Sequence, residues 1–149
     1  MKIVHQHLHV HPGTEDIVIP IRALRETLAK RRWRAVAEDG QEFGFDLDHI
    51  LNHGHFVSTE GSKYYAIEQE PELVLEVALG TDISMAARRA WLMGNLHFPV
   101  QITTDVIRVA DDSAVRQMLE REHIEYVATT AVFCPITGAG HGHHHHHHD

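Results

Sequence analysis

Hydrophobic and polar residues alternate along the first eleven positions of the chain. Every second residue from position 5 is a histidine, namely His5, His7, His9 and His11. Between and beside them stand three aliphatic residues, Val4, Leu8 and Val10. Residues two apart in a β-strand share one face. The pattern therefore predicts a strand whose apolar face packs on a core and whose histidines form a stripe facing solvent.

The rest of the first half also shows patterns typical of β-structure. Asp39-Gly40 favours a tight turn, because it tolerates positive φ; it predicts a hairpin of residues 31–37 and 43–47. A second hairpin is predicted from residues 55–59 and 63–67. Residues 21–30 are ambiguous, because they contain good helix formers but lie between predicted strands.

The rhythm changes after residues 69–72, which we take as a domain boundary. A strand is predicted at 73–78, then a helix capped by Asp82 or Ser84 that runs to about Met93 and is terminated by Gly94. Strands follow at 100–103 and 106–109, and a second helix is capped by Asp111 or Asp112. A last strand is predicted at 125–133. This β-α-β-β-α-β order is the ferredoxin-like arrangement.

The predicted fold class is α+β, with a β-rich N-terminal domain (1–71), a ferredoxin-like domain (72–134) and a disordered His-rich tail (135–149). Hydrophobic residues make up 43% of the 149 residues, which is enough for a core. The net charge of −8 disfavours nucleic-acid binding, which requires a basic surface. No apolar stretch is long enough to cross a membrane. With Cys134 as its one cysteine, the chain is expected to be cytoplasmic.

Metal binding is the chemistry that the histidines favour, since neutral imidazole is a common ligand of borderline transition metals. The C-terminal candidates follow a glycine-rich lead: His141, His143, His144, His145, His146, His147 and His148. A run of six histidines is also typical of a purification tag. The lead and the final Asp149 favour a native segment. His5, His7, His9 and His11 are possible additional ligands, and a polar strand face is the alternative.

Residues 90–102 resemble the Gly-Asn-Arg-His-x-Pro-x-Gln-Ile signature of the UreE family of nickel-donating urease accessory proteins. The matching residues are Gly94, Asn95, His97, Pro99, Gln101 and Ile102. Further similarity lies in residues 38–44, 51–54 and 69–77, in Arg108 and in Met118-Leu119. The chain departs from the signature at Leu96, where the family has arginine. It also has Asp111, Asp112 and Ser113 where some relatives have a further pair of histidines.

The resemblance implies a homodimer in which both copies of His97 bind one nickel ion. It also implies two partners, the urease accessory GTPase and the urease apoprotein complex. A two-fold axis duplicates any residue beside it, so one histidine per chain would become a pair of ligands. The residue types alone leave Zn²⁺ and Cu²⁺ open as alternatives to Ni²⁺.

The predicted function is that of a nickel metallochaperone, and not an enzyme, since no nucleophile–base arrangement, phosphate loop or dinucleotide motif is present. One alternative is a storage or buffering protein whose terminal histidines hold nickel, zinc or copper. Another is a peptide-binding assembly module of the urease complex. The first alternative predicts that losing His97 matters little, and the second predicts normal activity without any terminal histidine.

Overall fold

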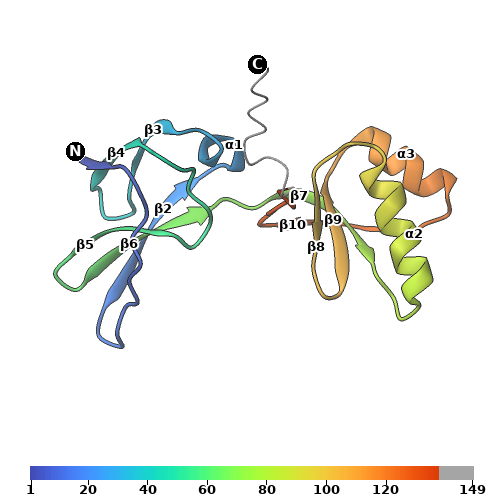
Figure 1. Cartoon of the computed structure of the whole chain (residues 1–149), viewed down its shortest axis with the longest axis horizontal. Helices are drawn as coiled ribbons and strands as arrows, with labels where there is room; N and C mark the ends of the chain where they lie inside the picture. Colours follow the sequence, from blue (N-terminus) through green and yellow to red (C-terminus); the bar gives the residue numbers. More distant parts are fainter. Residues whose placement is uncertain (138–149) are drawn as a thin grey trace, which may run out of the picture. The chain divides into compact units, whose positions relative to one another are not determined.

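The computed structural model describes residues 1–137, and the fold is mixed α+β (Figure 1). The chain divides into two compact units, Met1–Pro71 and a second that begins at Glu72. No helix in the described part of the chain is long and apolar enough to span a membrane. Each unit has its own sheets and its own buried cluster of hydrophobic side chains.

The first unit contains two three-stranded sheets. One has the order β1-β4-β3, formed by β1 (Lys2–Val4), β4 (Glu42–Asp46) and β3 (Arg32–Val36). The other has the order β2-β6-β5, formed by β2 (Ile17–Ala23), β6 (Lys63–Gln69) and β5 (Phe56–Glu60). Both predicted hairpins, β3–β4 and β5–β6, are confirmed. The side chains between them form one core, with Ile21, Phe43, Tyr65 and Ile67 almost fully buried.

Strands β1 and β2, neither of which was predicted with these bounds, both pair in parallel with distant partners. β1 pairs with β4, and β2 pairs with β6 along its whole length. The ambiguous stretch 21–30 divides at Leu24: β2 continues to Ala23, and the short helix α1 (Arg25–Leu28) follows. Leu28 anchors this turn because its side chain is buried in the core.

The predicted histidine strand is wrong. Regular pairing ends at Val4, and residues 5–11 are bends and irregular structure apart from one isolated bridge between Leu8 and Phe56. The physical reason is that the segment changes its hydrogen-bonding partner from one sheet to the other. Val4 pairs in the first sheet, whereas the N–H of Leu8 donates to the carbonyl of Phe56 in the second, at 2.7 Å. The segment therefore passes between sheets and presents no continuous histidine face.

The second unit has the predicted β-α-β-β-α-β order. Its sheet has the order β10-β7-β9-β8, formed by β10 (Val127–Ala131), β7 (Glu72–Ala78), β9 (Val106–Ala110) and β8 (Val100–Ile102). Helices α2 (Ile83–Gly94) and α3 (Ser113–Arg121) lie together beside it (Figure 1). Their apolar faces join the sheet in one core that includes Leu75, Ile107, Met93, Met118 and Leu119.

Both helices of the second unit begin at an aspartate. The Asp82 carboxylate accepts the N–H of Met85 at 3.1 Å, and that of Asp112 accepts the N–H of Ala114 at 2.8 Å. These contacts satisfy N–H groups that the helix itself leaves unpaired. Asp111 forms an ion pair with Arg116 at 2.7 Å. The carboxylates of Asp111 and Asp112 thus both form contacts with residues in the first turns of α3.

The last described residues return to the sheet edge. Phe133 is fully buried, and the N–H of Ile136 donates to the carbonyl of Val100 in β8 at 2.7 Å. Ile136, which lies in the segment predicted to be a disordered tail, is therefore attached to the folded unit. The seven tail histidines, from His141 to His148, lie outside the described residues.

Candidate metal centre

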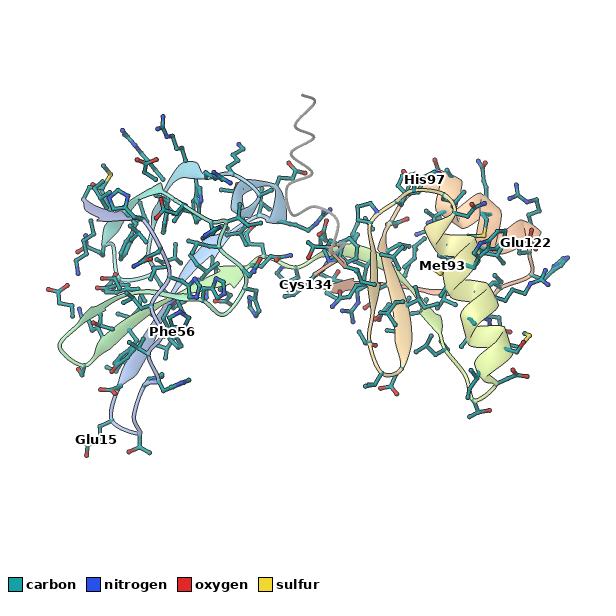
Figure 2. The ribbon with its side chains drawn as sticks, viewed as in Figure 1. Glu15, Phe56, Met93, His97, Glu122 and Cys134 are labelled. Atoms are coloured by element: carbon teal, nitrogen blue, oxygen red, sulfur yellow. The ribbon has the colours of Figure 1, made fainter. Side chains whose placement is uncertain are left out.

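His97 lies in the turn that connects α2 to β8 (Figure 2). The helix includes Gly94 as its last residue, and Asn95 is the C-cap with right-handed φ and ψ. The residue with left-handed backbone is His97 itself, with φ of 62°, and its N–H donates to the carbonyl of Gly94 at 3.1 Å. The prediction that Gly94 terminates the helix is thus accurate to one residue. The left-handed backbone conformation that ends the helix is adopted by His97 and not by Gly94.

A left-handed backbone costs a non-glycine residue on the order of 1 kcal/mol, although histidine adopts it more often than most. His123, after α3, has the same feature, with φ of 55°. The conformation therefore reflects how both helices end, and alone it does not distinguish a ligand. What distinguishes His97 is its surroundings.

The side chains of Leu96 and His97 lie in different environments. Leu96 packs against the core of the second unit, whereas His97 is exposed. The aliphatic residue in place of the signature's arginine is thus partly buried against this core. It leaves the neighbouring imidazole at the surface, where it can bind a ligand from outside the chain.

Large apolar side chains stand exposed on both sides of His97 along the chain. Trp91, in the last turns of α2, is 65% exposed, and Phe98 and Ile102 are 37% and 48% exposed. A contiguous patch of exposed apolar side chains is typical of a surface that binds another protein. Exposed apolar side chains thus precede and follow His97 in the sequence, and they are candidates for a protein–protein contact.

A side-chain network fixes the strand that follows His97. Arg108 in β9 donates to Glu76 in β7 at 2.7 and 3.0 Å and to the side-chain oxygen of Gln101 in β8 at 3.1 Å. The same Gln101 oxygen accepts the N–H of Cys134 at 3.0 Å. The signature glutamine thus joins β8 to β9 and to the segment that leads into the tail.

Within residues 1–137, no group of three His, Cys, Asp or Glu side chains is arranged to hold a metal ion. His97 is one exposed imidazole, and one imidazole cannot complete the coordination of a transition metal. Any metal bound there needs ligands from a second copy of the chain, from the tail or from water.

The N-terminal histidines do not act as one set. Nδ1 of His5 is hydrogen-bonded to the carbonyl of Asp46 at 2.8 Å, so this ring is tied to the first sheet. His7 instead stacks on His55, with ring centroids 4.0 Å apart, and meets the edge of His9 at 4.7 Å. His11 is exposed. The structure thus separates the predicted stripe and adds a residue, His55, that no periodicity in the sequence could connect with it.

The surroundings of His55 favour its neutral ring. Partial burial, and then the proximity of His7 and His9, lower the pKa of His55. The N–H of Asn52 donates to Nδ1 of His55 at 3.1 Å, which requires an unprotonated nitrogen at that position. Neutral imidazole is the form that binds metals.

Comparison with known proteins assigns the second unit to a family model. Residues 72–149 match the model described as the C-terminal domain of the UreE urease accessory protein. This range contains His97 and all of β7 to β10.

Three relatives, each described as urease accessory protein UreE, are similar over most of the chain. The protein of Thermosynechococcus vestitus is 38% identical over 119 residues, which are 78% of this chain and 82% of the relative. That of Chelativorans sp. is 35% identical over 112 residues, 74% and 70% of the two chains. That of Pseudomonas putida strain F1 is 32% identical over 131 residues, 86% and 78%.

Proposed function

The chain belongs to the UreE family of urease accessory proteins, and from this premise we propose that it carries nickel for the assembly of the urease active site. The ion is its cargo, and the chain makes and breaks no covalent bonds. The observation that carries the proposal is the exposed His97, on a turn whose Leu96 packs against the core, with exposed apolar side chains before and after it in the sequence.

The proposed tight site forms when two chains associate. A two-fold axis beside His97 would bring two imidazoles to one nickel ion. Burial of Trp91 and Phe98 between the chains would supply the driving force, at roughly 25 cal/mol per Å² of apolar surface removed from water. Two protein ligands leave coordination positions open, and open positions allow the ion to exchange onto a recipient.

The tail histidines are proposed to collect ions for this site. They follow Ile136, which is hydrogen-bonded to β8, so the tail starts near the strand that His97 precedes. A short tether gives a high effective concentration of the tethered group near its target. The partners that fit this role are the urease accessory GTPase and the urease apoprotein complex, which would take the ion onward.

The proposal is tested by titrating Ni²⁺ into the chain shortened by residues 139–149, which lowers the background binding. His97→Asn keeps a residue that accepts positive φ but removes the imidazole. We expect the tight step, one ion per two chains, to disappear. His123→Asn is the matched control, because His123 is also exposed and left-handed after a helix, and it should bind nickel as the parent does.

An unchanged tight step in His97→Asn would overturn the assignment. The same substitution is then made in the full-length chain. If His97→Asn keeps the tight ion there and loses it only when the terminal histidines are also replaced, the chain acts as a metal buffer. Thermal unfolding of both metal-free variants checks that neither substitution acts through the fold.

A further inference from the structure

Three imidazoles meet in the first unit, whereas His97 belongs to the second. The rings of His7 and His55 are parallel within 10° and 4.0 Å apart, and His9 meets His7 edge-on at 4.7 Å. His9 is exposed, and the other two are half-buried. Nothing in the proposed nickel transfer at His97 requires this cluster.

The isolated bridge between Leu8 and Phe56 brings the three residues together. Figure 2 labels Phe56 in the first unit. In an antiparallel pair, the residues on either side of Leu8 project to the same face as the residues on either side of Phe56. His7 and His9 flank Leu8, and His55 precedes Phe56. The backbone thus places all three Cβ atoms on one face of this short two-strand contact.

We propose that His7, His9 and His55 bind one divalent transition-metal ion, of the Ni²⁺, Cu²⁺ or Zn²⁺ class, at a site separate from His97. Three imidazole nitrogens with water in the remaining positions suit these borderline ions. The site goes beyond the proposed function, because it lies in the other unit and needs neither His97 nor a second chain.

In the orientations that the structure shows, these three side chains do not form a metal-binding group, so the rings must rotate before they can bind one ion. Stacked rings do not aim their nitrogens at a common point, and an imidazole–metal bond is about 2 Å long. His9 is exposed, so its side chain can turn without a backbone change. Binding through His55 gives up the hydrogen bond from Asn52, a contact that contributes modestly to stability. The site is therefore weaker than three free imidazoles in ideal positions, and it releases its ion readily.

The proposed site differs from a stripe of four histidines in the residues that it uses as ligands. His5 is held to the carbonyl of Asp46, and in the described part of the chain no ring contact joins His11 to the other rings. The cluster excludes both of these histidines and requires His55. Single substitutions therefore separate the two arrangements.

The test uses the full ¹⁵N-labelled chain, with Ni²⁺ added beyond the amount that saturates the tail. Octahedral Ni²⁺ is paramagnetic and broadens the amide signals of nearby residues. We expect residues 7–9 and 55–57 to broaden together, at the same added concentration. His55→Gln and His9→Gln should each raise the nickel concentration for half-broadening at least tenfold. His11→Gln is the matched control in the same segment and should have no effect.

Two results would overturn the site. One is broadening of residues 7–9 without residues 55–57, and the other is an unchanged half-broadening concentration in His9→Gln, which changes an exposed side chain and leaves the His55 hydrogen bond in place. His97→Asn separates this proposal from the nickel-carrier role: it should leave broadening at 7–9 and 55–57 unchanged, even if His97 itself binds no metal.

Discussion

The N–H of Ile136 donates a 2.7 Å hydrogen bond to the carbonyl of Val100. Val100 begins β8, and only Phe98 and Pro99 separate it from His97. The chain to the first tail histidine, His141, therefore starts beside this strand. The five residues from Ile136 to His141 can span at most about 17 Å of backbone when fully extended.

Lengthening this tether should slow the delivery of nickel to His97. Twenty Gly/Ser residues inserted after residue 138 lengthen the connection from five residues to about twenty-five. The effective concentration of a flexibly tethered group falls roughly as the −3/2 power of length, which predicts about a tenfold slower transfer from tail to His97. The rate is measured by stopped-flow absorbance after loading less than one nickel per chain.

The matched control for the tether carries the same twenty residues after Asp149, beyond the last histidine. It keeps the length and composition of the inserted chain but not its position, so the transfer rate should equal that of the parent. Equal rates in all three proteins would show that the place where the tail starts has no role in delivery.

Replacing Trp91 should weaken the association of two chains. Trp91→Asp puts a charge where an exposed indole, 65% accessible, would be buried between copies. We expect dimerisation to weaken at least tenfold in sedimentation equilibrium, and the tight nickel step to weaken in parallel. Ile83→Asp is the control, because Ile83 is on the same helix and 86% exposed. A parent chain that is monomeric with nickel bound would contradict this prediction.

The hydrogen bond from Tyr65 to Asp39 should make stability depend on alkaline pH. The phenol is buried and donates to the carboxylate at 2.8 Å, and this contact, with burial, raises the pKa of Tyr65 from 10.0 to about 12. Between these values the unfolded chain has lost a proton that the folded chain keeps. The stabilisation is therefore complete below pH 10 and is lost as the pH rises to about 12.

Tyr65→Phe removes this dependence. At pH 8 the variant should be less stable by about 1–3 kcal/mol, since a hydrogen bond to a charged group is lost. The difference from the parent should shrink between pH 10 and 12, as measured by urea unfolding of both metal-free proteins. A difference that stays constant over this range would show that the phenol does not retain its proton in the folded state.

Local sequence features were enough for much of the second unit. The carboxylates of Asp82 and Asp112 mark helix starts because a cap needs only the next few residues. The turn at Asp39-Gly40 determines the β3–β4 hairpin in the same way. His97 became a candidate ligand through a short signature and not through any pattern of hydrophobicity.

Only the tertiary structure decided the arrangements that join distant segments. No pattern among neighbouring residues predicts the parallel pairings of β1 with β4 and of β2 with β6. A parallel partner is set by the packing of the whole core. Alternation along residues 4–11 predicted one strand, but Val4 and Leu8 bond to different sheets. That change of partner broke the stripe and placed His7 against His55. Periodicity determines which residues of one strand share a face. Which residues become neighbours across two strands depends on pairings between segments that are far apart in the sequence.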